Sequence, residues 1–165
     1  WLIMASRKKK KDQPNDSVIE NRRARHDYDI SDTLECGIQL RGTEVKSIRA
    51  GRASLAEGWI KADLEPLALT LHSVHVAEYP PAGPRQHDPV RSRLLLAHAR
   101  EIKKLALAAD GDGATLIPLK VYFKDGRAKV LVGVGQGRRK SDKRQDLAKK
   151  EARREMDRAM TSRRI

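Results

Sequence analysis

The sequence has few aromatic residues and only one cysteine. Phenylalanine, tryptophan and tyrosine make up 4% of the 165 residues, and the cysteine is Cys36. A single cysteine cannot form a disulfide within the chain, which is typical of a reducing, cytoplasmic compartment. The small aromatic content predicts a small aliphatic core. It also argues against a protein that reads single strands by stacking many bases.

Long apolar runs are also missing. A helix that spans a bilayer needs about 20 consecutive apolar residues, and no run in the chain approaches that length. Trp1–Ile3 before Met4 are too short for the apolar part of a signal peptide, and a run of lysines follows. We expect no membrane partner, and Trp1–Ile3 are left out of the fold prediction.

No set of catalytic or metal-binding residues stands out. Cys36 is predicted on the inward face of a strand, where a thiol is usually inert, and no serine, histidine and acid follow a known nucleophile motif. His72 and His75 lie three residues apart on a predicted strand and therefore point to opposite faces. Adding His87 and His98 yields no standard ligand spacing. We predict no enzymatic activity, no metal and no cofactor.

What the chain does have is positive charge. It carries 35 Lys or Arg against 22 Asp or Glu, a net charge of +13. This charge predicts a polyanionic partner, because lysine and arginine release the counterions that phosphates hold. No helix-turn-helix or zinc-finger spacing points to duplex DNA. Structured RNA, recognised by shape and backbone, is therefore favoured over a membrane surface.

Length and charge distribution predict one monomeric domain with a basic segment at each end. Residues 1–20 are predicted to be a disordered basic arm, which serves either solubility or RNA contact. Residues 21–137 form the folded domain. Residues 138–165 hold twelve Lys or Arg against five Asp or Glu. This tail favours helix over residues 142–160 but has a thin apolar stripe, so we predict that it is disordered alone and helical on a charged surface.

The folded region begins with an alternating strand and a corner. Apolar and polar residues alternate from Leu34 to Leu40, which predicts one buried face. Gly42 ends this strand, Thr43 is placed to cap a short helix, and Gly51 is placed to close it in a left-handed turn. On this helix Val45 and Ile48 are predicted to face inward, and Lys46 and Arg49 are predicted to face outward. Such a corner is either part of a binding site or an ordinary corner with solvated charges.

Further strands are predicted at 58–62 and 67–77, and residues 79–89, with four prolines, are predicted to form a loop. Asp88 as cap and Pro89 at the first position predict a helix that ends at Ala109. Its predicted apolar stripe is Leu95, Ile102, Leu105, Ala106 and Ala109. The cations predicted to lie mostly outside that stripe are Arg91, Arg93, Arg100, Lys103 and Lys104.

A hairpin is predicted from Leu116 to Val134, with Asp125-Gly126 as its loop. The predicted pairs are Lys124–Arg127, Phe123–Ala128, Val121–Val130, Leu119–Val132 and Ile117–Val134. The last four are apolar, so turn and register agree. The opposite face carries Lys120, Tyr122, Lys124, Arg127 and Lys129. The glycines that follow, Gly133, Gly135 and Gly137, are predicted to end the sheet as a hinge rather than to form a phosphate loop.

Four motifs occur together in the chain. They are Asn21–Tyr28, Gly42–Gly51, Arg91–Arg93 with the leucines that follow, and Asp142–Arg144. From about residue 18 to its end, the chain resembles the SsrA-binding protein family, the small protein B that partners transfer-messenger RNA. The resemblance implies a mainly β fold, an antiparallel closed barrel of oligonucleotide-binding topology, flanked by three helices and followed by a basic tail.

The resemblance also implies a function. Members of this family bind the tRNA-like domain of transfer-messenger RNA at its elbow and fill the space of the missing anticodon arm. Delivered with elongation factor Tu, the complex enters stalled ribosomes, where the tail lies helically in the empty messenger channel of the small subunit. The implied role is ribosome rescue and peptide tagging by trans-translation. The alternative is a general barrel protein that binds structured RNA.

Motif matching and charge predict two sets of site residues. The RNA-binding set is Asn21, Arg22, Arg23, Arg25, Glu35, Lys46, Arg49, Arg52, Leu96, His98 and Lys124. The ribosome-contacting set is His26, near the decoding centre, with Arg138, Arg139, Lys140, Asp142, Lys143, Arg144 and Met160. The family often has a basic residue and then three leucines, and the matching run here is Leu94-Leu95-Leu96-Ala97. Ala159 is also small, which leaves Met160 as the better apolar anchor.

Overall fold

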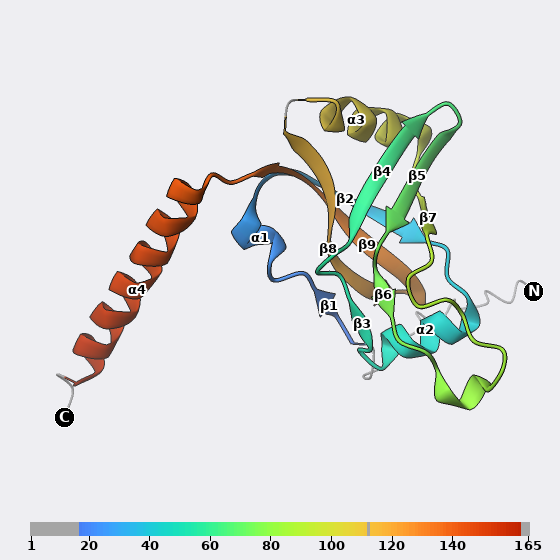
Figure 1. The fold of residues 1–165 in the computed structure, drawn as a ribbon, viewed down its shortest axis with the longest axis horizontal. Helices are drawn as coiled ribbons and strands as arrows, with labels where there is room; N and C mark the ends of the chain where they lie inside the picture. Colours follow the sequence, from blue (N-terminus) through green and yellow to red (C-terminus); the bar gives the residue numbers. More distant parts are fainter. Residues whose placement is uncertain (1–16, 112, 163–165) are drawn as a thin grey trace, which may run out of the picture.

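The computed structural model describes residues 17–111 and 113–162 (Figure 1). The strands are β1 (Ile19–Glu20), β2 (Tyr28–Ile38), β3 (Ala53–Ser54), β4 (Trp59–Leu64), β5 (Leu67–His72), β6 (His75–Val76), β7 (Arg93–Leu96), β8 (Ala114–Lys124) and β9 (Arg127–Gly137). The helices are α1 (Ala24–Asp27), α2 (Gly42–Arg49), α3 (Ala99–Ala109) and α4 (Lys140–Ser162), with a 3-10 turn η1 (Pro80–Ala82).

One antiparallel sheet dominates the fold. Its strands pair in the order β1-β8-β4-β5-β7-β2-β9, and β8 also pairs with β9, so the path of strands returns on itself. β3 and β6 form a separate two-stranded sheet. Helices α2 and α3 lie at opposite ends of the large sheet, and α4 extends away from it (Figure 1). The predicted mainly β, barrel-like fold with flanking helices is confirmed.

The side chains on the inner side of the curved sheet form the main core. Residues from two helices complete it: Ile48 of α2, and Ile102 and Leu105 of α3. The alternation predicted for the first strand is confirmed, since Cys36 and Ile38 are buried in this core. Burial raises the pKa of the Cys36 thiol to about 11, so the thiol stays protonated. A second, smaller cluster lies under α1. Its members are Ala24, Ile117 and Leu119, with Tyr28, Ile30 and Leu131 packed against them.

The corner after β2 has the predicted helix and a different cap. Gly51 has a φ of +75° and closes the turn as expected. The cap residue is Arg41 rather than Thr43, because the Glu44 carboxylate reaches back to accept a hydrogen bond of 2.7 Å from the Arg41 amide. The Thr43 hydroxyl is instead 2.8 Å from Nδ1 of buried His87. The cap prediction was wrong because Thr43 is bound by a residue 44 positions away.

The prediction of a helix from Pro89 to Ala109 was also wrong for the first half of this segment. Asp88 forms only a turn, with its carboxylate accepting from the Val90 amide at 2.9 Å. Residues 93–96 form strand β7, which pairs with both β2 and β5. Helix α3 begins after His98, where the Glu101 carboxylate accepts from the His98 amide at 2.8 Å. The predicted end at Ala109 is confirmed.

A buried ion cluster explains why this segment is a strand. Arg93, predicted to lie outside the apolar stripe of a helix, is 1% exposed, and Glu44 is fully buried. The Arg93 guanidinium donates to the Glu44 carboxylate at 2.8 Å and to the Val74 carbonyl at 2.9 Å, and Arg91 donates to the same carboxylate at 2.6 Å. Burial by itself would raise the pKa of Glu44, but these hydrogen bonds outweigh it and lower that pKa.

The hairpin register agrees with the prediction only near the turn. Lys124 pairs with Arg127, Phe123 with Ala128 and Val121 with Val130, as predicted. Below these pairs β8 has a bulge between Pro118 and Lys120, so Val132 faces Pro118 and Val134 faces Leu116. The predicted pairs Leu119–Val132 and Ile117–Val134 were therefore wrong. The bulge turns Ile117 and Leu119 away from the main core and into the cluster under α1.

Three predicted boundaries also change. The strand predicted at 67–77 is divided into β5 and β6 at Ser73, whose φ is +57°. Gly133 and Gly135 do not end the sheet, because β9 continues to Gly137. A Cβ at Gly133 would lie 2.8 Å from Leu119, so these glycines make room for the cluster under α1. At the other end, Ile19–Glu20 of the predicted disordered arm form strand β1; residues 1–16 of that arm lie outside the described residues.

The tail is the helix α4, slightly longer than the predicted 142–160. Its apolar residues Leu147, Met156 and Met160 are exposed. Disorder of the free tail, and its ordering on a charged surface, stay predictions.

We predict that Arg93→Met destabilises the protein by about 3 kcal/mol, because removing one partner leaves the Glu44 charge buried and incompletely paired. Urea unfolding followed by circular dichroism measures the loss. The control is Arg100→Met on the exposed side of α3, which should change stability by less than about 0.5 kcal/mol. Equal stability of the two variants would contradict the role given to Arg93.

The stabilising effect of the Glu44 carboxylate depends on pH. Since the pKa of Glu44 is lowered from 4.5, this effect is present above about pH 4.5 and is lost as pH falls through the lowered pKa.

Candidate nucleic-acid interface

Three of the predicted RNA-binding residues, Glu35, Leu96 and Lys124, lie on one surface, which we call the outer face. It is the side of β8, β9, β2 and β7 that points away from the main core. Gly37 of β2 lies opposite Lys129 of β9 and opposite Leu96 of β7, so the register brings the three strands' outward residues together. The outer face consists of Lys120, Tyr122, Lys124, Arg127, Lys129, Glu35, Gly37 and Leu96.

Glu35 is the one acid at the centre of this basic surface. The Tyr122 hydroxyl donates a hydrogen bond to its carboxylate, and Lys124 Nζ lies 3.3 Å from Oε1. The hydrogen bond from Tyr122 is the main reason that the pKa of Glu35 is lowered, with Lys124 adding to the effect. Burial and the Glu35 charge raise the pKa of Tyr122 to about 12. The result is a charged acceptor held in a fixed position at neutral pH, suited to bind the amino groups of nucleobases.

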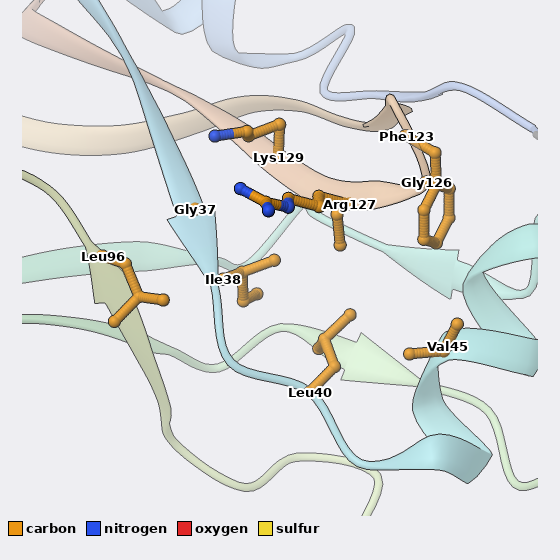
Figure 2. A pocket seen from close by; sticks show the side chains of 10 residues that line it. Gly37, Ile38, Leu40, Val45, Leu96, Phe123, Gly126, Arg127 and Lys129 are labelled. Atoms are coloured by element: carbon orange, nitrogen blue, oxygen red, sulfur yellow. The ribbon is translucent and has the colours of Figure 1, made fainter. Parts of the chain in front are cut away.

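A groove of about 470 Å³ is lined in part by Gly37, which lies two residues from Glu35 in β2. Ile38, Leu40 and Val45 contribute apolar side chains to its lining, and Arg127 and Lys129 contribute cations. Figure 2 shows both cations extending from β9 toward β2. An apolar lining with cations at its margin suits a ligand that has flat rings and phosphates.

Leu96 and His98 are accessible, as a contact with RNA requires. Leu96 is 61% exposed at the end of β7, next to the Leu94 side chain that is 48% exposed. His98 follows as the exposed cap residue of α3.

Asn21 differs from the other predicted RNA contacts because it is buried. Its amide nitrogen donates to the carbonyls of Leu55 and Pro118, at 3.1 Å each, and its amide oxygen accepts from the Ala24 backbone at 3.2 Å. Asn21 therefore fixes the start of α1 on the barrel. A direct contact between Asn21 and RNA stays a prediction, and so does contact by the exposed residues Arg22, Arg23 and Arg25 around α1.

The cations of the corner lie against aromatic rings. Lys46 Nζ is 5.0 Å from the centre of the Tyr79 ring, and the Arg49 guanidinium is 5.0 Å from the centre of the Phe123 ring. These contacts hold α2 against the loop before β7 and against the hairpin. Arg52 follows α2 and is exposed. RNA binding by these three cations stays a prediction.

Three of the predicted ribosome-contacting residues, His26, Arg138 and Lys143, meet at a second place, where α4 leaves the barrel. We call this place the tail root. Asp27 Oδ1 accepts from Lys143 Nζ at 3.0 Å and lies 3.1 Å from His26 Nδ1, and the Asp27 carbonyl accepts from the Arg138 amide at 3.0 Å. Arg138 also forms an ion pair with Asp146 one turn into α4. The hydrogen bond from Lys143 is the main reason that the pKa of Asp27 is lowered.

Sequence reasoning missed Asp27, although an acid within the basic segment Asn21–Tyr28 was a visible signal. Of the other predicted tail residues, only Met160 lies far from the tail root along the chain. Arg139, Asp142 and Arg144 are exposed near the tail root, Lys140 begins α4, and Met160 is 72% exposed near the far end of the helix.

Two further observations concern residues 17–111 and 113–162. In this part of the chain no three His, Cys, Asp or Glu side chains lie so that they could hold a metal ion. None of its helices is both long enough and apolar enough to cross a membrane. His72 and His75, the pair considered for metal binding, are separate: His72 is hydrogen-bonded to Ser92 at 2.9 Å, and His75 lies exposed in β6.

Comparison with known proteins finds one family. The family model for SmpB protein matches residues 18–162. The SsrA-binding protein of Thermobifida fusca (strain YX) is 50% identical over 161 residues, which are 96% of this chain and 99% of that protein. The SsrA-binding protein of Staphylococcus carnosus (strain TM300) is 49% identical over 156 residues, 94% of this chain and 98% of that protein.

A solved structure is similar as well. It is described as "tmRNA-SmpB: a journey to the center of the bacterial ribosome". The similar region covers 79% of this chain and 94% of that one, with a TM-score of 0.64 and 41% sequence identity.

We predict that Asp27→Asn loosens the tail root without unfolding the barrel. The Arg138 amide should exchange its hydrogen about two- to five-fold faster, the factor expected for loss of a partly exposed ion pair. Hydrogen exchange measures this, with Asp157→Asn in the far part of α4 as the control. Unchanged exchange at Arg138 would show that Asp27 does not hold the tail.

Because the pKa of Asp27 is lowered from 3.8, its contact with Lys143 is present above about pH 4 and is lost as pH falls through the lowered value.

Proposed function

The chain belongs to the SmpB family, and from this membership we propose that it binds transfer-messenger RNA and acts in trans-translation on stalled ribosomes. The similar solved structure, whose description joins tmRNA, SmpB and the bacterial ribosome, supports this role. It acts there as an RNA-binding adaptor rather than as an enzyme, and its place of action is the cytoplasm.

The observation that carries the proposal is the charged Glu35 within a basic outer face. A surface that bound RNA by charge alone would gain nothing from a carboxylate, because the acid repels phosphates. An acid held by Tyr122 and Lys124 can instead accept hydrogen bonds from base amino groups, which only a correctly shaped RNA presents. Glu35, Leu96 and His98 would then contact the tRNA-like domain, and the surrounding cations would contact its backbone.

The second part of the proposal concerns the tail. The basic helix α4 extends away from the barrel (Figure 1), and Asp27 connects its root to the segment that carries His26. In our proposal the barrel stands where a tRNA has its anticodon arm, His26 lies near the decoding centre, and α4 enters the empty messenger channel of the small subunit. The protein acts as a monomer and is delivered with elongation factor Tu.

Glu35→Arg should weaken binding to the tRNA-like domain about ten-fold or more, since a charge-assisted hydrogen bond is lost. A gel shift against this RNA and against a complete elongator tRNA, at low and near-physiological salt, measures the effect. Glu78→Arg in an exposed loop makes the same change in charge and should not weaken binding.

For the unchanged protein, preference for the tRNA-like domain should survive added salt. Equal binding to both RNAs, lost together as salt rises, would contradict the proposal and support a general RNA-binding protein held by its +13 charge.

Removing residues 142–165 should leave RNA binding intact and abolish peptide tagging on stalled ribosomes. A reconstituted translation reaction on a message without a stop codon measures tagging, and the gel shift measures binding of the same truncated protein. Tagging at the full rate would show that the tail is not needed.

A further inference from the structure

Trp59 is an exposed tryptophan in a chain with few aromatic residues. It lies in β4 and is 45% exposed, although the core beneath it is aliphatic. Its ring stacks on the ring of His72 in β5, with 4.4 Å between ring centres and 21° between ring planes. His72 is held in turn by a hydrogen bond of 2.9 Å between its Nδ1 and Ser92 Oγ. The tryptophan is thus supported from one side while nearly half of it faces solvent.

Strand register places this pair on the same side of the sheet as Glu35. Trp59 lies opposite His72, Thr70 opposite Leu94, and Leu96 opposite Gly37. Residues two apart on a strand point to the same side, so His72 and Thr70 share a side, and so do Leu94 and Leu96. The outer face therefore continues across β7 and β5 to Trp59. The distance from β2 to β4 is three strand spacings, about 14 Å.

We propose that Trp59, supported by His72, is a stacking platform for an unpaired base of the RNA that the outer face binds. This inference rests on the proposed function, because it takes transfer-messenger RNA as the partner. One base would lie on the open part of the indole, and the neighbouring nucleotides would run over Leu94 and Leu96 toward Glu35. Each base has a flat π-face, so such a platform needs no particular sequence.

The charges along this surface favour RNA over a protein partner. Lys124, Arg127 and Lys129 lie at the hairpin end, and Lys61 lies on the same side of β4 as Trp59. The acids on this surface are each bound to a lysine: Glu35 to Lys124 at 3.3 Å, and Asp63 to Lys61 at 2.9 Å. A strip with an aromatic platform at one end and cations at the other matches the bases and phosphates of a single strand.

Tryptophan fluorescence tests the proposal in the full-length protein. The chain has two tryptophans, so Trp1→Phe leaves Trp59 as the only one. Titration with the tRNA-like domain should quench its emission, and acrylamide should reach it at least two-fold less well in the complex. Unchanged emission and unchanged acrylamide quenching at saturating RNA would overturn the proposal.

Affinity gives the second readout. Trp59→Ala should weaken binding of the tRNA-like domain by about 5- to 150-fold, the range for loss of one stacking aromatic, and Trp59→Phe should restore most of it. Leu107→Ala, an exposed apolar residue of α3, is the matched control and should bind as the unchanged protein does. Full affinity in Trp59→Ala would overturn the platform. If that variant lost only ribosome binding, Trp59 would be assigned to a contact with the ribosome instead.

Different results would contradict the proposed function and the Trp59 platform. If the unchanged protein does not prefer the tRNA-like domain over elongator tRNA, the proposed function fails and the platform fails with it. If that preference holds while Trp59 neither quenches nor affects affinity, only the platform is wrong.

Discussion

The buried carboxylate of Glu44 is the interaction on which the arrangement of the outer face depends. It receives hydrogen bonds from Arg91, Arg93 and the Arg41 backbone, and so joins α2 to the strand β7. With Arg93 inward, the alternation of a strand forces Leu94 and Leu96 outward, where both are exposed. A buried ion pair adds little net stability compared with an apolar pair but penalises every arrangement that separates its members. Here it determines which side chains of β7 lie on the outer face.

Strand β2 connects the two functional regions. Asp27 immediately precedes it and holds the tail root, and Glu35 lies near its other end on the outer face. The strand pairs with β9 over most of its length, so it is a stiff element. The position of the outer face relative to the origin of α4 is therefore set by one paired strand rather than by a flexible linker.

Sequence patterns predicted the features that depend on residues close together in the chain. The Asp125-Gly126 turn, the pairs next to it, the end of α3 and the inward Cys36 follow from propensity and alternation. The sequence could not show what depends on distant partners: Arg93 is a strand residue because its partner Glu44 lies 49 positions away, and Thr43 is not a cap because His87 binds it. Of the proposed site, the motifs suggested Glu35, Leu96 and His98. Asp27 and Trp59 were missed, because an ion pair across 116 positions and a shared sheet side appear only after folding.

The bulge in β8 also divides the hairpin into two parts with opposite phase. Toward the turn, Val121 points inward and the cations point out; toward the base, Ile117 points out to meet α1. The phase of β9 does not depend on the length of the loop, because its pairing with β2 holds Lys129 outward and Val130 inward. The loop at the tip can therefore vary in length without altering the half of the hairpin that carries α1.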